Sequence, residues 1–133
     1  MAKVDDGMFW GVGRRKSAIA RVRIKTGSGK IIVNDLEGDK YFVTAIQRHP
    51  LTQPFKATDT VGKFDVYVNV RGGGKQAQAE AAKLGLARAL CQINDDFNHA
   101  LRDASLMTRD ARMKERKKPG LHGARKGTQF SKR

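Results

Sequence analysis

A turn of three consecutive glycines, placed between a strand-like and a helix-like segment, constrains the fold of this 133-residue chain more than any other feature. Before the turn, residues 64–70 alternate apolar and polar side chains, as a strand with one buried face does. After it, apolar residues recur from Ala79 to Ile93 at the spacing of one helical stripe. Glycine has no Cβ, so the turn can adopt positive φ angles. The sequence therefore predicts a strand, a tight turn and a long helix from about Gln76 to Leu90.

The same turn has the residue types of a phosphate-binding loop. The free N–H groups at the start of a helix favour negative charge, and a cation on each side of the turn adds to that field. Taken alone, the turn is better explained as a flexible strand-to-helix connection with two solvated cations, so the phosphate interpretation needs support from the rest of the chain. The candidate residues are Arg71, Gly72, Gly73, Gly74 and Lys75.

Two nucleotide-binding patterns nearly match this turn, and both are rejected. The spacing Gly72-x-Gly74-x-x-Ala77 fits the dinucleotide pattern, but that pattern needs a second parallel strand that ends in an acid. Here the helix leads into more helical sequence instead. A P-loop needs Ser or Thr after its lysine, whereas Lys75 is followed by Gln76. An anion bound at this turn is therefore not predicted to be a mononucleotide.

The composition predicts a polyanionic partner. The chain has 27 Lys and Arg against 13 Asp and Glu, a formal net charge of +14, and this excess favours nucleic acid or an anionic membrane as the partner. It contains no apolar run of membrane-spanning length and no secretory signal pattern, so a cytosolic protein is expected. A single cysteine, Cys91, excludes an internal disulfide, and with three scattered histidines it cannot build a usual zinc site. No metal and no other cofactor is predicted.

The positive charge is concentrated at the end of the chain. Residues 104–133 hold 10 Lys and Arg against two acids, which is more than half of the net charge. Such a segment buries too little apolar area to offset the cost of ordering it. We therefore expect two parts, a globular body over residues 1–103 and an extended basic tail over residues 104–133, whose 30 residues could reach on the order of 100 Å.

A row of cations marks a second candidate binding surface. Residues 18–25 alternate strictly, with Ala20, Val22 and Ile24 on one face and Arg21, Arg23 and Lys25 on the other. Like charges on one strand face repel each other, so three cations without an acid are better explained by an external anion than by solvation alone. A further basic cluster, Arg14, Arg15 and Lys16, precedes this strand.

The remaining elements follow from turn and cap signals. The turn at 27–29 predicts that a strand over 30–33 pairs with the strand at 18–25 as a hairpin. A helix over 39–48 should end at His49-Pro50, because proline disfavours helix in the residue before it. The other expected elements are a short strand from Phe9 to Val12, a short helical turn from Leu51 to Phe55, a loop over 58–63, and a final helix capped by Asn94 or Asp95 that extends to about Arg102. On the long helix, Arg88 should lie opposite the apolar stripe, free to reach a partner or water.

Five ordered blocks of the sequence resemble protein nine of the small ribosomal subunit, of the bacterial and organellar type, from about Phe9 to Arg133. These blocks are 11–17 with 20–22, 71–75 with Gln78 and 85–90, 106–110, 115–118, and 129–133. The resemblance implies an α/β two-layer sandwich of the α+β type. In this architecture a small mixed sheet carries helices on one face, one crossover is left-handed, and a basic C-terminal tail extends from the body.

The resemblance also implies a function, which is a structural role in translation rather than catalysis. Proteins of this kind bind rRNA in the head of the small subunit beside neighbouring head proteins. Their last three residues, here Ser131, Lys132 and Arg133, lie near the anticodon stem-loop of the peptidyl-site tRNA. No membrane and no small-molecule substrate is implied, and the expected location is the ribosome, in the cytoplasm or in an organelle matrix or stroma. The rRNA-binding residues expected from the pattern and the resemblance together are Arg14, Arg15, Lys16, Arg21, Arg23, Lys25, Arg71, Gly72, Gly73, Gly74, Lys75, Arg88, Arg109, Arg112, Arg116, Lys117, Lys118, Arg125 and Lys126.

Two functions of other classes remain as alternatives. One is a nucleotide-dependent enzyme that uses the glycine turn, which nucleotide binding by the body would favour. The other is a membrane-active or DNA-compacting basic protein, which competition between rRNA and duplex DNA would separate from an rRNA-binding protein.

Overall fold

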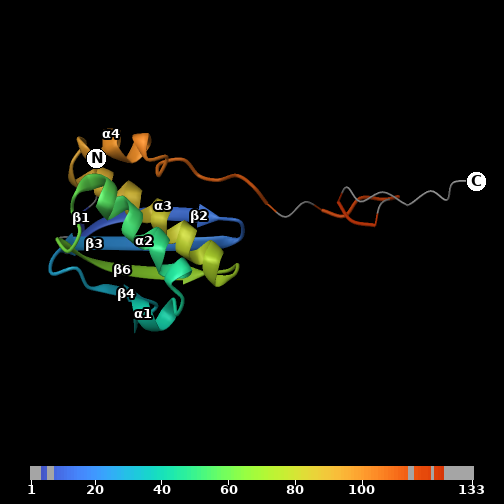
Figure 1. The fold of residues 1–133 in the computed structure, drawn as a ribbon, viewed down its shortest axis with the longest axis horizontal. Coiled ribbons are helices and arrows are strands. Elements are labelled where there is room, and N and C mark those ends of the chain that lie inside the picture. Colours follow the sequence, from blue (N-terminus) through green and yellow to red (C-terminus); the bar gives the residue numbers. More distant parts are fainter. Residues whose placement is uncertain (1–3, 6–7, 114–115, 121, 125–133) are drawn as a thin grey trace, which may run out of the picture.

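Strands and helices form two layers in the computed structural model of the chain, which describes residues 4–5, 8–113, 116–120 and 122–124 (Figure 1). The helices lie on one face of a sheet, and the other face is left uncovered by the described residues. This is the α+β two-layer architecture that the resemblance implies. The strands are β1 (Val4–Asp5), β2 (Met8–Arg15), β3 (Ala18–Thr26), β4 (Ile31–Val33), β5 (Leu36–Glu37) and β6 (Phe64–Arg71). The helices are α1 (Gly38–Tyr41), α2 (Ala45–Thr58), α3 (Lys75–Ile93) and α4 (Phe97–Asp103).

The sheet is mixed, with the strand order β1-β2-β3-β6-β4-β5. Strand β3 pairs antiparallel with β2 on one side and with β6 on the other, whereas β4 pairs parallel with β6. The connection from β4 to β6 is therefore a crossover, and it contains α1 and α2. In Figure 1, β4 and β6 both run from left to right, β6 lies above β4, and the helices are nearer the viewer, which makes this crossover left-handed.

The predicted hairpin between β3 and β4 is wrong, because β6 lies between these two strands. Side-chain hydrogen bonds explain the placement. The carboxylate of Asp65, near the start of β6, accepts hydrogen bonds from the backbone N–H groups of Ser28 and Lys30, both at 3.0 Å. At the other end, the Asn34 side chain accepts from Val70 N at 2.9 Å and donates to Val70 O at 3.1 Å. Both ends of the β4 segment are thus held to β6. The backbone N–H of Lys30 is also the largest cause that lowers the pKa of Asp65.

Helix α3 rests directly on β2 because two glycines of that strand leave room for it. Alternate residues of β2, Gly11 and Gly13, face the helix. A Cβ on Gly11 would lie 2.0 Å from the Gly85 carbonyl oxygen, and a Cβ on Gly13 would lie 1.8 Å from the Ala81 carbonyl oxygen. The inner residues of β3 and β6 are buried against the same layer of the core. Besides α3 residues, this core contains Ala20, Val22, Ile24, Val66 and Val68.

The predicted helix over 39–48 is also wrong, because it is two separate helices. Helix α1 ends at Tyr41, and α2 begins after Thr44, whose side chain accepts a hydrogen bond from Gln47 N at 3.3 Å. Helix α2 then continues through Pro50 and Pro54 to Thr58. The two prolines are four residues apart, so they share one face, and both are buried there. Burial on the core side offsets the two backbone hydrogen bonds that proline cannot donate.

Three smaller boundaries differ from the sequence-based expectations. The strand predicted over 9–12 is β2, which is longer than predicted, and the long helix α3 is also longer. The predicted cap of the last helix is wrong: Asn94 accepts from Asp96 N at 3.0 Å, but α4 begins only at Phe97, and no side chain caps it. Beyond α4, Leu106 is 5% exposed and belongs to the core, so packing of the body extends past residue 103.

Candidate nucleic-acid interface

The uncovered face of the sheet carries the predicted row of cations. Burial alternates along β3 as expected, with Ala20, Val22 and Ile24 fully buried. Between them Arg21 is exposed, and Arg23 and Lys25 are half-buried. Within the described part of the chain, none of these three cations forms an ion pair. Because a strand holds them in register, they form a fixed array of positive charge. A carboxylate beside it, Asp65, lies opposite Lys25 and has its pKa lowered first by the backbone N–H of Lys30 and also by the charge of Lys25.

Two aromatic residues on the neighbouring strands complete this array, and the sequence analysis missed both. The register places Trp10 of β2 opposite Arg23, with Tyr67 of β6 opposite Arg23 on its other side. The guanidinium carbon of Arg23 lies 5.4 Å from the Trp10 ring centroid and 5.8 Å from that of Tyr67. Arg21 lies 5.6 Å from the Trp10 ring, and Lys25 lies 5.5 Å from the Tyr67 ring. The period-2 pattern of residues 8–15 and 64–71 was the signal that could have found these rings.

One end of the same face holds two more predicted cations. Arg14 pairs across to Ile19, and Ile19 pairs with Arg71, so both arginines share the face of Arg21. Both are exposed and form no ion pair with the residues that the structure describes. Lys16, in the turn between β2 and β3, is exposed beside them with a φ of 51°. The structure therefore brings together the predicted residues of β2, β3 and β6.

The glycine turn has the positive φ angles that were predicted, but its close approach is to its own chain. Gly72 and Gly73 have φ values of 75° and 62°. A Cβ on Gly72 would lie 2.5 Å from the Ser17 carbonyl oxygen. The Gly72 carbonyl oxygen accepts from Gln78 Nε2 at 3.0 Å, and Gln78 Oε1 accepts from the Tyr41 hydroxyl at 2.6 Å. At Gly74, by contrast, nothing lies within 4 Å of an added Cβ, so the start of α3 is open on this side.

The two cations that flank the turn differ in their surroundings. Arg71 is exposed on the uncovered face. Lys75 instead contacts Tyr41: its Nζ donates to the Tyr41 carbonyl oxygen at 3.2 Å and lies 3.3 Å from the ring centroid. Lys75 therefore links α3 to the end of α1 within the body.

Arg15 faces away from the cation array and holds the start of the tail. Its Nε lies 2.7 Å from Glu80 of α3, and its Nη1 contacts the Asp110 carboxylate. Arg112 also binds Asp110, through Nε and Nη2 at 2.7–3.0 Å. These hydrogen bonds from Arg112, followed by the charges of Arg112 and Arg15, hold the pKa of Asp110 well below its usual range. Two of the predicted RNA-binding residues, Arg15 and Arg112, are thus engaged in an anchor for the tail, here called the Asp110 anchor.

Arg88 of α3 is half-buried, and part of its guanidinium is engaged within the body. Its Nη1 donates to the Val12 carbonyl oxygen at 2.7 Å. Strand β1 pairs only with Met8 and Phe9 of β2. Val12 therefore lies on a part of the β2 edge that β1 does not pair with. Arg88 satisfies one acceptor of that edge.

The remaining predicted residues lie in the tail. Arg109, Arg116 and Lys117 are exposed, and Lys118 is half-buried. Arg116 Nη1 donates to the Lys117 carbonyl oxygen at 3.2 Å. The predicted residues outside the described part of the chain are Arg125, Lys126, Ser131, Lys132 and Arg133.

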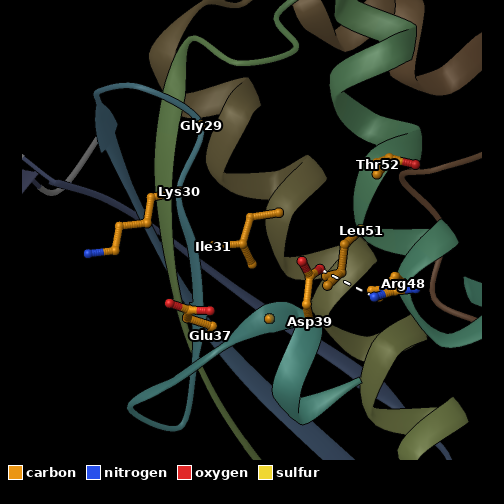
Figure 2. A pocket seen from close by; sticks show the side chains of 9 residues that line it. Gly29, Lys30, Ile31, Glu37, Asp39, Arg48, Leu51 and Thr52 are labelled. Carbon is orange, nitrogen blue, oxygen red and sulfur yellow. Dashed lines mark ion pairs between the residues drawn. The ribbon is translucent and has the colours of Figure 1, made fainter. Parts of the chain in front are cut away.

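One hollow of the described body lies on the helix side of the sheet and has a mixed charge. Figure 2 shows this hollow, of about 460 Å³, between the start of β4, α1 and α2, where Asp39 pairs with Arg48 at 3.5 Å. Its lining combines two carboxylates, Glu37 and Asp39, with two cations, Lys30 and Arg48, so it has no excess positive charge to attract a phosphate. Among the described residues, no group of three or more His, Cys, Asp and Glu could hold a metal ion. No described helix is long and apolar enough to cross a membrane.

A comparison with protein families matches residues 13–133 of this chain to the family described as ribosomal protein S9/S16. The matched segment contains the β3 cations, the glycine turn, α3 and the tail. It begins within β2, so Trp10 lies outside it.

Proposed function

The chain belongs to the ribosomal protein S9/S16 family, and from this membership we propose that it binds rRNA of the subunit head through the uncovered face of its sheet. Membership in the family makes it a structural protein of the small ribosomal subunit that takes part in translation, rather than an enzyme. The finer assignment, to protein nine beside neighbouring head proteins, rests on the five sequence blocks. A location in the cytoplasm or in an organelle is proposed on the same basis.

The observation that carries this proposal is the array of Arg21, Arg23 and Lys25 without ion-pair partners in the described chain. Like charges on adjacent positions of one strand face repel each other in the free protein. Phosphates of an RNA backbone relieve this repulsion and release counterions from the RNA. Because β3 is a central strand, it holds the cations at fixed spacing, which positions the RNA on the body.

The start of α3 supports a second phosphate contact beside this face. Gly74 is open to solvent, and the first N–H groups of the helix have no intrahelical acceptor. Arg71 lies at the end of β6 next to it. The nucleotide-dependent enzyme is less well supported, since Gly72 and Gly73 pack against residues 17–18 and Lys75 is held by Tyr41.

For the tail, we propose contacts to rRNA along its cations and to the peptidyl-site tRNA at its end. The supporting observations are the high charge of residues 104–133 and the Asp110 anchor, which sets where the tail leaves the body. A terminal arginine offers a planar fork of donors that suits phosphates. Deletion of Ser131, Lys132 and Arg133 should weaken tRNA binding to reconstituted small subunits and leave subunit assembly unchanged. Equal tRNA affinity for both forms would remove the tRNA role.

The test of the main proposal compares two triple variants with the same loss of charge. The first carries Arg21→Gln, Arg23→Gln and Lys25→Gln on the uncovered face. The matched control replaces three exposed lysines elsewhere with glutamine, namely Lys40, Lys56 and Lys63. Binding to an rRNA fragment of the subunit head, and co-sedimentation with small subunits at moderate salt, should fall for the first variant and stay near wild type for the control. Equal losses would show that binding depends on net charge alone. Preference for duplex DNA or anionic vesicles would instead favour a membrane-active or DNA-compacting protein.

A further inference from the structure

The two rings on the uncovered face belong to one continuous chain of side chains drawn from three strands. In space the order is Arg21, Trp10, Arg23, Tyr67 and Lys25, with each cation 5.4–5.8 Å from the centre of a neighbouring ring. Both aromatic residues pair with the same residue of β3, so they stand on either side of Arg23. A surface that bound only phosphates would need the cations and not the rings.

Neither ring is part of the hydrophobic core, which lies on the opposite face of the sheet. Trp10 and Tyr67 are half-buried, and Arg21 and Lys25 of the neighbouring strand β3 lie over their rings. Two donors in the group, Trp10 Nε1 and Arg23 Nε, are shielded from solvent and make no hydrogen bond to the described residues. Shielded donors without acceptors cost free energy, so this arrangement favours a rearrangement when a ligand arrives.

We propose that this face binds unpaired RNA bases, which stack on Trp10 and Tyr67, and does not only follow the phosphates of a duplex. The inference rests on the proposed rRNA-binding function and names the kind of RNA that the face takes. Arg21 and Lys25 are long side chains at the two ends of the group. When each turns toward a phosphate, it uncovers a ring for the adjacent base, so one RNA segment replaces the cation–ring contacts with stacking and ion pairs. A sheet that presents aromatic rings between cations is a surface suited to single-stranded RNA.

The chain has a single tryptophan, so its fluorescence reports on this face alone. The experiment titrates the full-length protein with three probes: unpaired oligoadenylate, a blunt RNA duplex with the same number of phosphates, and inorganic polyphosphate. Stacking predicts that oligoadenylate quenches the emission of Trp10, while the duplex and polyphosphate bind without quenching it. Quenching of equal size by polyphosphate would overturn the inference, because no base is present.

A pair of variants tests the second ring while Trp10 still reports. Base–aromatic stacking contributes about 1–3 kcal/mol per base, so Tyr67→Leu should weaken binding of oligoadenylate roughly 5- to 150-fold. The matched Tyr67→Phe keeps the ring and should bind nearly as wild type, and polyphosphate affinity should be the same for all three proteins. Thermal melting of each variant shows that it is folded.

The outcomes separate this inference from the proposed function. If Tyr67→Leu binds oligoadenylate as tightly as wild type while the protein still binds the rRNA fragment, base stacking is wrong and rRNA binding stands. If the wild-type protein binds no rRNA fragment, the proposed function fails, and the stacking site fails with it.

Discussion

Gly13 of β2 and Ala81 of α3 are in such close contact that a methyl group on the glycine would lie 1.8 Å from the alanine carbonyl oxygen. The contact brings helix backbone against strand backbone without a side chain between them. Gly11 makes the same kind of contact with Gly85, so two glycines of β2 let the strand and α3 pack backbone to backbone.

Gly13→Ser should therefore destabilise the protein strongly. Any Cβ at this position overlaps backbone atoms, which cannot swing aside as a side-chain end can, so the expected loss is about 3 kcal/mol in the free energy of unfolding. Urea denaturation measures it. The matched control is Gly74→Ser, where nothing lies within 4 Å and serine is a good helix N-cap, so stability should not fall. Equal stability of the two variants would contradict this packing.

Gln78 should be a structural residue and not an RNA ligand. It is 8% exposed and bridges the Tyr41 hydroxyl to the Gly72 carbonyl oxygen. Gln78→Leu leaves both groups without their partner and should cost about 1–3 kcal/mol of stability. Gln92→Leu, an exposed change on the same helix, serves as the control and should cost little. If Gln78→Leu leaves the melting temperature unchanged but weakens RNA binding, the assignment is wrong.

The salt dependence of rRNA binding should depend largely on the tail. Residues 114–133 carry eight Lys and Arg. If about six tail cations contact single-stranded backbone, they contribute about −4 to the slope of log affinity against log salt. Deletion of 114–133 keeps Leu106 in the core and keeps the Asp110 anchor, and it should flatten the slope by most of that amount. An unchanged slope would assign the charge contacts to the body.

The Asp110 anchor should resist acid. Because Arg112 and Arg15 hold the pKa of Asp110 below the ordinary value of about 3.9, the carboxylate stays charged down to a pH where a free aspartate is protonated. The stabilisation is therefore fully present above about pH 3.9 and is lost only as the pH falls through the lower, folded value. NMR titration of the Asp110 carboxyl carbon measures the midpoint. Arg112→Gln should raise that midpoint, and an ordinary midpoint in the wild-type protein would contradict the anchor.

Local patterns predicted those parts of the fold that depend on local interactions. The alternation of β3 and β6, the positive φ of Gly72 and the long helix α3 all follow from residue type and period. The partner of β4 did not, since it depends on hydrogen bonds that the Asp65 carboxylate accepts, 35 residues away from Lys30 in sequence. The helix over 45–58 was not predicted, because its two prolines are compensated by tertiary burial, which a local rule omits.

For a related reason, the cations of the candidate site were predicted and its aromatic rings were not. Cations stand out in a sequence, so the β3 array was identified, but a ring becomes informative only when the register places it beside a cation. Arg15, Lys75 and Arg88 look the same in sequence as Arg14 and Arg71. They differ because Glu80, Tyr41 and Val12 supply partners that only the folded chain brings near.

The neighbours Arg14 and Arg15 point to opposite faces of β2, so a register error in the pairing of β2 with β3 would change which of them faces α3. A slip of β2 by one residue would exchange the two arginines, so an arginine would still face Glu80 and charge alone would not oppose the slip. The same slip would turn Gly11 and Gly13 away from the helix and place side chains with a Cβ against its backbone. A mispaired molecule would thus be unable to dock α3, so the two glycines, and not the two arginines, select the register of β2.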